Sequence, residues 1–204
     1  MTLLSAFRQP IAIVYNLVNN KGGVIKTYKK EIALSWLESA KGSEFKSVFS
    51  LRENLFEDYK EFYNLFWSKV LLPWHVMELI RLRVAQLHDC QPELSLRYRF
   101  KKAPTELKIE SLSDWHKDSA YTEVDRACLE IAELFVQDPH AISDKMAERA
   151  KAEIGDAGLV ALMEWLALCD GFCRFQLMTG VSYDMLIRYA DFDMPETDSD
   201  AEGN

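Results

Sequence analysis

The sequence predicts an all-α fold, on three observations. Apolar residues recur at helical spacing through most of the chain, and no segment alternates strongly between apolar and polar residues as a half-buried strand does. Capping residues and prolines fall where the helical patterns begin and end. The 204 residues, 49% of them hydrophobic, are enough to bury a core without the help of disulfides.

We expect one helical domain over residues 1–190, which includes an N-terminal helical extension, and a disordered acidic tail over residues 191–204. The tail carries six acidic residues and no Lys or Arg, so 26 of the 32 acidic residues belong to the body, against 24 basic ones. Because the body is nearly balanced and the pI is near 5.1, we expect no nucleic-acid partner.

The N-terminal region is weakly patterned. Residues 11–18 form a short apolar run that lacks a small-residue cleavage site, and we interpret it as core. Residues 24–28, which follow two glycines, are a weak strand candidate. No run of eighteen apolar residues occurs, so we expect no membrane span. Four cysteines are too few for a disulfide scaffold, and we expect a cytoplasmic protein with reduced thiols.

The first strong helical pattern covers residues 52–70. Two adjacent apolar stripes predict a wide core face, which we favour over an aromatic cofactor box. The stripes are Leu55, Tyr59, Phe62 and Phe66, and Phe56, Tyr63, Trp67 and Val70. Pro73 ends this helix and starts the next one, residues 74–89, on which Arg81 and Arg83 are expected to face water.

Residues 95–102 mix basic and aromatic side chains after a turn signal at Pro92. Such a mixture can bind nucleic acid, but a charged helix face is favoured because the body is near neutral. Residues 103–121 resemble a connector. Thr122, with Asp125 three residues later, predicts the start of a helix that ends at Asp138-Pro139.

Two further helices are predicted after this stop. Ser143 is expected to cap a short polar helix that runs to Ile154, and Asp156 to cap a helix from Ala157 to about Phe175. This last helix is apolar on nearly every side and should therefore be buried.

A candidate reactive site surrounds Cys90. His88 lies two residues before this thiol, Glu93 three after it, and Glu78 twelve before it. Twelve helical residues turn the chain by about 1200°, which leaves Cys90 about 120° from the face of Glu78. The two side chains share a site if the chain turns near Asp89. Without such a site, a single cysteine beside a polar turn is structural.

Two stretches carry a resemblance to a known family. Glu78-x11-Cys90 within MELIRLRVAQLHDC, and the later segment YTEVDRACLEIAELFVQDPHAISDKMAERAKAEIGDAGLVALMEWLALCDGFCRF, resemble the alkylhydroperoxidase D-like, or carboxymuconolactone decarboxylase, superfamily over about residues 50–180. The resemblance implies an all-helical bundle that oligomerises as dimers, trimers or hexamers. In redox members, a Cys-x-x-Cys pair cycles between dithiol and disulfide, a glutamate and a histidine relay protons, and peroxides or peroxiredoxin partners are the substrates.

Mapped by position, the family's glutamate falls on Glu78 and its first cysteine on Cys90, whereas Glu93 replaces the second cysteine and Arg97 the histidine. The candidate catalytic residues are therefore Cys90, Glu78, His88, Glu93 and Arg97. We expect Glu93 and Arg97, four apart, to pair on a helix and to fill the space of the missing thiol and imidazole. A single-thiol site is then expected.

Other side chains have alternatives. Cys169 and Cys173 lie four apart on the last helix, where they are either small core residues, which is favoured, or a source of a second thiol for Cys90. Cys128 is predicted to be core, and Asp170 and Arg174 a buried ion pair. His75 and Glu78 can share a metal, but a di-metal set is not found, so neither a metal nor a cofactor is expected.

Two classes of function remain. One is an antioxidant, peroxidase-related enzyme that uses Cys90 with Glu78 and His88 on a peroxide. The other is a non-redox relative that keeps the fold and binds a small molecule or a partner. In both, the aromatic stripes are too wide for one small monomer to cover, so a homo-oligomer is expected.

Overall fold

The computed structural model describes residues 50–68, 71–98 and 102–179, together with Val48 and the pairs 13–14 and 29–30. Helices account for most of these residues, so the predicted all-α class is confirmed. The acidic tail, most of the N-terminal region and the strand candidate at residues 24–28 lie outside the described residues. The described strands are short: β1 (Ile13–Val14) pairs antiparallel with β2 (Lys29–Lys30), with Ile13 opposite Lys30.

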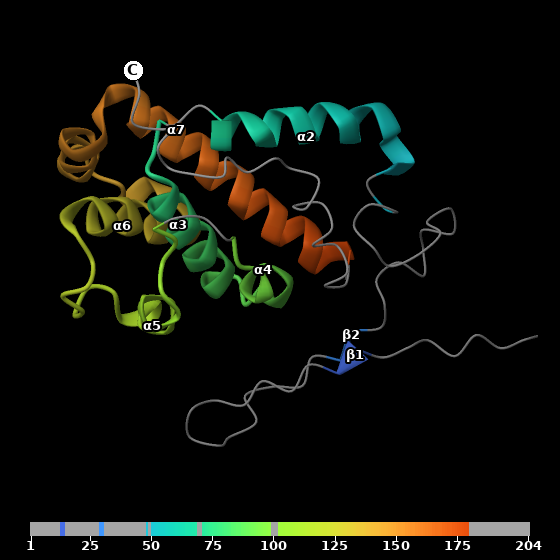
Figure 1. The fold of residues 1–204 in the computed structure, drawn as a ribbon, viewed down its shortest axis with the longest axis horizontal. Helices are drawn as coiled ribbons and strands as arrows, with labels where there is room; N and C mark the ends of the chain where they lie inside the picture. The colour runs from blue at the N-terminus through green and yellow to red at the C-terminus, as the bar shows by residue number, and fades with distance from the viewer. Residues whose placement is uncertain are drawn as a thin grey trace, which may run out of the picture.

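The helical elements follow one another through the rest of the chain (Figure 1). They are η2 (Ser50–Arg52), α2 (Glu53–Ser68), α3 (Trp74–Leu87), α4 (Gln91–Ser95), α5 (Glu106–Glu110), η3 (Leu112–Asp114), α6 (Glu123–Gln137), η4 (Pro139–Ala141) and α7 (Asp144–Thr179). None of the helices in the described part of the chain combines the length and the apolar character that a membrane span requires.

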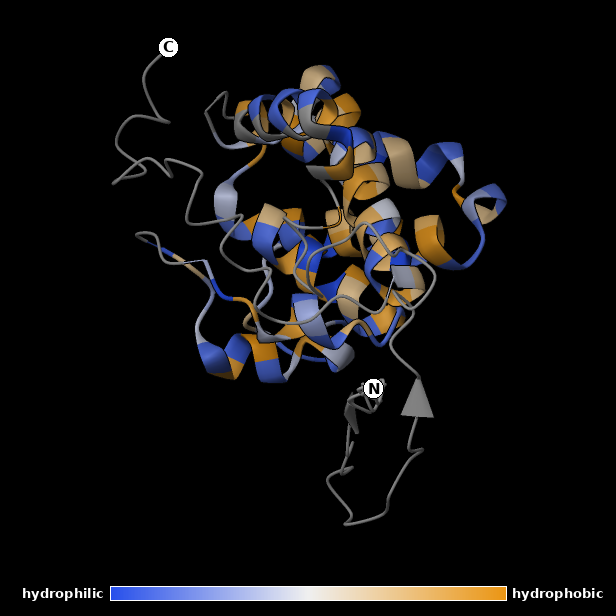
Figure 2. Ribbon diagram, turned by 90° about the vertical axis from the view of Figure 1, so that its right-hand side faces the viewer, coloured by the Kyte–Doolittle hydropathy of each residue, from blue (hydrophilic) through white to orange (hydrophobic). Residues whose placement is uncertain are grey.

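Helix α3 lies at the centre of the fold. It packs against both α6 and α7, which also pack against each other, and ten of its fourteen residues are buried. Pro73 supplies the turn before its first residue, as predicted. Figure 2 shows hydrophobic and hydrophilic residues alternating along the described helices, as expected for helices that bury one face. A helix that is buried on nearly every side needs an apolar sequence, and WHVMELIRLRVAQL meets this condition except at its charged positions.

Aromatic side chains join α2 to this core. Tyr63 and Trp67 are buried and pack with Trp165 of α7, whose indole Nε1 donates to the carbonyl oxygen of Met77 at 3.0 Å. The face is narrower than predicted, however, because Phe62 is 49% exposed. Leu55 is equally exposed. Tyr59 and Phe66 of the same stripe do contact α7, through Phe172 and Trp165, so this stripe is covered only in part.

The helix start predicted at Thr122 is confirmed. Its hydroxyl accepts from the backbone N–H of Asp125, and the Asp125 carboxylate accepts from the backbone N–H of Thr122 at 2.9 Å, which completes a capping box. The preceding connector is more structured than expected. It forms α5 and η3, and its buried Ile109 and Leu112 build a second apolar cluster with Leu79 of α3.

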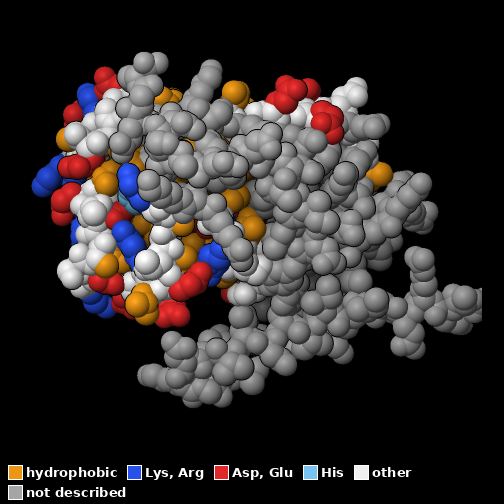
Figure 3. Space-filling view, in the orientation of Figure 1, with side chains coloured by type: hydrophobic (Ala, Val, Ile, Leu, Met, Phe, Trp, Pro, Cys, Tyr) orange, Lys and Arg blue, Asp and Glu red, His pale blue; other side chains and the backbone are white. Residues whose placement is uncertain are grey.

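Helix α7 consists of two helical segments joined by a kink at Gly155, where φ is +73° and ψ is 175°. The two helices predicted around this point are thus confirmed. Residues with a side chain rarely adopt this conformation, so glycine is required there. The second half begins at Asp156 and reaches Thr179, one turn beyond the predicted end. On the described surface visible in Figure 3, basic and acidic side chains are interspersed.

Candidate functional site

A tight turn at Asp89 brings the candidate residues together. Helix α3 ends at Leu87, Asp89 adopts a left-handed φ of +53°, and Cys90 precedes the first residue of α4. The backbone N–H of Cys90 donates to the carbonyl oxygen of Ala85 at 2.8 Å. The turn predicted near Asp89 is therefore present, and it folds α4 back against α3.

Arg81 is the centre of the site, although it was expected to face water. Its side chain is 2% exposed, and each of its five N–H groups has an acceptor. Nε and Nη2 bind the two oxygens of Glu78 at 2.8 and 2.7 Å. Nη1 binds the carboxylate of Glu93 at 2.9 Å and its carbonyl oxygen at 2.7 Å, and Nη2 binds the carbonyl oxygen of Leu96 at 2.9 Å. Glu78 and Glu93 are as deeply buried as Arg81.

Three more side chains complete this buried cluster. The Tyr98 ring lies against the guanidinium of Arg81, 5.1 Å from ring centre to Cζ, and its hydroxyl is hydrogen-bonded to that of Tyr63. The second carboxylate oxygen of Glu93 accepts from Nε2 of Gln176 on α7. We call Glu78, Arg81, Glu93 and Gln176 the carboxylate cluster. It ties α3, α4 and α7 to one another.

The carboxylate cluster holds more negative than positive charge. Burial raises the pKa of Glu78 above its ordinary value, although the charge and hydrogen bonds of Arg81 act in the opposite direction. Burial alone would lower the pKa of Arg81, but the two carboxylates raise it well above its usual range. Arg81 therefore remains charged, and Glu78 takes up a proton at a higher pH than an ordinary glutamate does.

Arg83, also expected to face water, is largely buried. Its side chain is 13% exposed and its Nη2 lies 2.5 Å from Oε1 of Glu133 on α6. Arg83 thus lies in the contact between α3 and α6 and does not point into solvent.

The predicted pair of Glu93 and Arg97 is wrong. Arg97 instead binds Glu106, with its Nε 3.2 Å from Oε1, and donates to the carbonyl oxygens of Leu94 and Leu96. Helix α4 ends at Ser95 and Leu96 is extended, so a spacing of four residues no longer places the two side chains on one face. The charged helix face predicted for residues 95–102 is absent from residues 96–98 for the same reason.

Cys90 is fully buried, and its thiol neighbour is Cys173 of α7. The proximity of the Cys90 thiol raises the pKa of Cys173, together with burial and the nearby charge of Glu93. Cys169 and Cys173 are core residues, as favoured from the sequence, and Cys128 is also buried. Burial raises the pKa of Cys128 to about 12.

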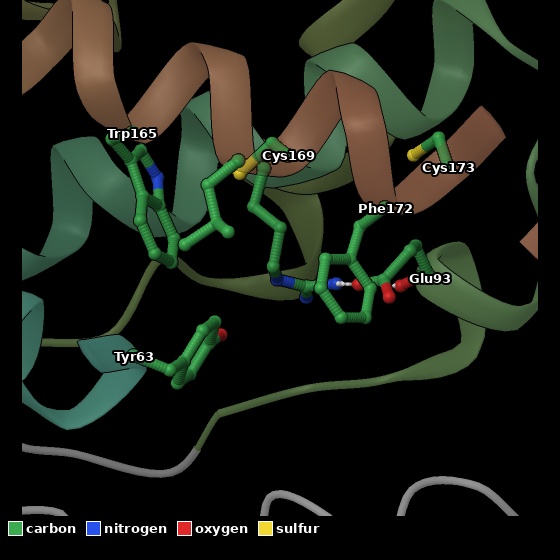
Figure 4. A pocket seen from close by; sticks show the side chains of 8 residues that line it. Tyr63, Glu93, Trp165, Cys169, Phe172 and Cys173 are labelled. Atoms are coloured by element: carbon green, nitrogen blue, oxygen red, sulfur yellow. Dashed lines mark hydrogen bonds and ion pairs between the residues drawn. The ribbon is translucent and has the colours of Figure 1, made fainter. Parts of the chain in front are cut away.

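A small cavity lies between the thiols and the carboxylate cluster (Figure 4). Its volume is about 10 Å³, which is close to the space of one water molecule. Figure 4 shows Cys169, Phe172 and Cys173 approaching it from α7, with Glu93 and Tyr63 on other sides. The full lining is Tyr63, Arg81, Glu93, Trp165, Leu168, Cys169, Phe172 and Cys173.

A second, larger cavity of about 350 Å³ is bordered by Glu78. Its lining is mixed, and consists of Glu78, Arg97, Tyr98, Ala103, Pro104, Glu106 and Ile109. Glu78 lines this larger cavity and is not among the residues that line the small one.

His88 belongs to a different interaction. Its Nε2 lies 2.5 Å from Oδ1 of Asp170, whose second oxygen accepts from Nε of Arg174 at 2.8 Å. The predicted pair of Asp170 and Arg174 forms, but it is not buried, since the Arg174 side chain is 61% exposed.

His75 lies 3.4 Å from Asp125 rather than beside Glu78. Among the described residues, no group of three His, Cys, Asp or Glu side chains is arranged to hold a metal ion.

The structure thus brings Glu78, Glu93 and Cys90 into one region and places His88 and Arg97 in separate ion pairs. Sequence reasoning missed Arg81 and Gln176. One signal was available, because Arg81 follows Glu78 by three residues in a helix that is otherwise almost wholly apolar. No protein-family model, curated protein or solved structure matches this chain.

Proposed function

We propose that this chain is an alkylhydroperoxidase D-like protein that acts on peroxides through the thiol of Cys90. The observation that carries the proposal is the turn at Asp89, which sets Cys90 beside Cys173, and Cys173 in turn lines a cavity with Arg81 and Glu93. A thiol, an acidic group with a raised pKa and a small cavity are the parts that peroxide reduction by a cysteine requires.

The chemistry starts at the thiolate of Cys90. Its sulfur attacks one peroxide oxygen, the O–O bond breaks, and the products are a sulfenic acid and an alkoxide or hydroxide that takes up a proton. Glu78, whose pKa is raised by burial, is an acidic group of the carboxylate cluster that exchanges its proton nearer to neutrality than an ordinary glutamate does. Arg81 has no N–H left for the peroxide, because all five are bound within the protein. Turnover is therefore expected to be slow.

The test is peroxide consumption with dithiothreitol as the reductant. Wild type is compared with Cys90→Ser and with the control Cys128→Ser, which removes a buried thiol on α6 outside the site. We expect consumption to fall to the protein-free background in Cys90→Ser and to persist in Cys128→Ser. Equal consumption by all three proteins would contradict the proposal.

A second function is favoured by a different observation. Both oxygens of Glu78 are bound by Arg81, and the adjoining cavity of about 350 Å³ is large enough for a small organic molecule. A non-redox relative would bind such a molecule there, with Arg97 as the cationic group. Thermal shifts with a panel of small carboxylic acids test this function. A shift that survives in Cys90→Ser and is lost in Arg97→Ala, without peroxide consumption, would select it.

The proposal includes assembly into a homo-oligomer in a reducing, cytoplasmic setting. Large apolar side chains are exposed on neighbouring parts of α2, the following turn and α7, and border an apolar groove of about 160 Å³. They are Phe62, Leu65, Leu71, Val160 and Met163. Light scattering coupled to size-exclusion chromatography is expected to give a multiple of 23.6 kDa at micromolar concentration. A monomer would contradict this part of the proposal.

A further inference from the structure

Two contacts one helical turn apart align α4 with α7. Cys90 meets Cys173, and three residues later in both segments Glu93 meets Gln176. Residues three apart on a helix lie on one face, so the equal spacing holds the two segments side by side in a fixed register. The contact between the thiols is therefore supported by a second, polar contact and by the packing of α3 on α7.

The two sulfurs are buried together. Cys90 is 0% and Cys173 1% exposed, and both belong to one buried cluster, in which the side chain of Cys90 is near enough to perturb the thiol of Cys173. Neither needs to cross solvent to reach the other, and both side chains come from segments that are long distances apart in the sequence. Forming a disulfide would bring their Cβ atoms to a separation of about 3.5–4.5 Å.

The alternative partner on the same helix is less suitable. Cys169 precedes Cys173 by four residues, and side chains at this helical spacing have Cβ atoms about 5–6 Å apart. This is wider than a disulfide allows, so a bond between Cys169 and Cys173 would require α7 to unwind locally. Cys128 lies on α6 and is not part of the group around Cys90.

We propose that Cys90 and Cys173 form a reversible dithiol–disulfide pair, in which Cys173 supplies from α7 the second sulfur that position 93 lacks. As a step in peroxide turnover this rests on the proposed function. Attack of Cys90 on the peroxide yields the sulfenic acid, and the sulfur of Cys173 then displaces its oxygen as water. In total, one peroxide gains two electrons and becomes an alcohol and a water, while two thiols lose two protons and form one S–S bond. An external dithiol returns the pair by exchange.

This inference replaces the single-thiol site that the sequence suggested. The spacing Cys-x-x-Glu excludes a second thiol within α4, and it says nothing about a thiol delivered by another helix. Cys173 is a core residue, as expected from its apolar surroundings, and the core is also where Cys90 is found.

The experiment uses the full chain and two oxidants. The protein is equilibrated in a dithiothreitol redox buffer in one arm and exposed to hydrogen peroxide in the other, then blocked with N-ethylmaleimide and mapped by mass spectrometry. We expect the four free thiols to fall to two in both arms, with one linked peptide pair that joins Cys90 to Cys173. Because the disulfides are mapped in the wild-type protein, the result does not depend on whether a variant folds.

Variants then assign the roles. Cys173→Ser is expected to lose the disulfide and to accumulate a dimedone-reactive sulfenic acid at Cys90 under peroxide. The matched control Cys169→Ser, one turn away on the same helix, is expected to keep the disulfide. A link from Cys90 to Cys169, or the absence of any link in the redox buffer, would overturn the inference.

The two proposals fail in different ways. A Cys90–Cys173 disulfide in the redox buffer without peroxide consumption supports the pair and removes the proposed peroxide function. Peroxide consumption that depends on Cys90 and proceeds unchanged in Cys173→Ser removes the pair and leaves the proposed function in place.

Discussion

Replacing Arg81 with methionine tests the energetic role of the carboxylate cluster. Methionine keeps an unbranched apolar stem of similar length but removes the charge and all five N–H donors. Three carboxylate oxygens and the carbonyl oxygens of Glu93 and Leu96 then lose a partner in a region that is at most 8% exposed. The expected result is a large loss of stability.

The magnitude follows from what remains after the substitution. A buried acceptor without a partner costs about 1–3 kcal/mol, so five of them would exceed the whole stability of many domains. Two of the five keep another donor, since the backbone N–H of Leu96 binds the carbonyl oxygen of Glu93 at 3.3 Å and the backbone N–H of Tyr98 binds Oε1 of Glu78 at 3.5 Å. The carboxyls can also take up protons. We therefore expect a loss of about 3–5 kcal/mol in the free energy of unfolding, as for other broken buried ion pairs.

The loss should depend on pH. Without Arg81, nothing offsets the burial that already raises the pKa of Glu78, so its pKa in the folded variant rises further. A carboxyl with a raised folded pKa stabilises the fold below its unfolded pKa, and this contribution is lost as the pH rises through the folded value. The deficit of Arg81→Met is therefore smallest near pH 4.5, the ordinary value for Glu, and grows toward neutrality.

Urea unfolding followed by tryptophan fluorescence measures this deficit at about pH 5 and about pH 8. Arg149→Met is a matched control, because Arg149 also binds two glutamates, Glu130 at 3.0 Å and Glu123 at 3.1 Å, but its side chain is 43% exposed. We expect that control to lose at most about 1 kcal/mol at both pH values. Equal losses for the two variants, or a deficit of Arg81→Met that does not change with pH, would refute the reasoning.

Three further predictions concern other parts of the fold. Gly155→Ala should lower the free energy of unfolding in urea by about 1–3 kcal/mol, because φ at this position is positive. Gly171 has a helical backbone and open space around it, so Gly171→Ala should raise the free energy of unfolding by about 0.5–1 kcal/mol. A similar effect of both substitutions would contradict the strain at Gly155. Burial alone would raise the pKa of Asp125, but hydrogen bonds from His75, Lys108 and Thr122 hold this pKa well below its ordinary value. The Asp125 carboxylate therefore stabilises the fold above its unfolded pKa, and this stabilisation is lost as the pH falls below that value. Acid unfolding monitored by circular dichroism should accordingly be less steep in Asp125→Ala. Cys128, with its pKa raised to about 12, should be alkylated by iodoacetamide much more slowly in the native than in the urea-unfolded protein, as measured by mass spectrometry; equal rates would show that it is accessible.

Features that depend on neighbours in sequence were predictable. The capping box at Thr122 and Asp125 forms between residues three apart, and Pro73 fixes its own φ, so both could be identified from a few letters. The break at Gly155 was likewise predictable, because one helical pattern ends at Ile154 and Asp156 is a capping residue for the next.

Features that depend on distant residues were not. Arg81 is buried because acceptors 12 and 15 residues later fold back onto it, and the pattern of α3 alone does not contain that information. The partner of Glu93 is Arg81 instead of the nearer Arg97, since α4 ends before the spacing of four residues can operate. The meeting of Cys90 and Cys173 depends on the register in which α7 docks.

The saturated guanidinium of Arg81 has a consequence for how this part of the chain is held together. Five acceptors from the α3 helix, the α4 helix and the residue after it converge on one planar cation, much as ligands converge on a structural zinc ion. Unlike zinc, this cation is synthesised with the chain, so chelators cannot remove it and its occupancy does not depend on metal supply. Lysine cannot replace it, because an ammonium group has three donors and lacks the planar fork that reaches both carboxylates and both carbonyls at once. The five-residue α4 is too short to be stable alone, and it is held in place by a cross-linking cation that is a permanent part of the chain.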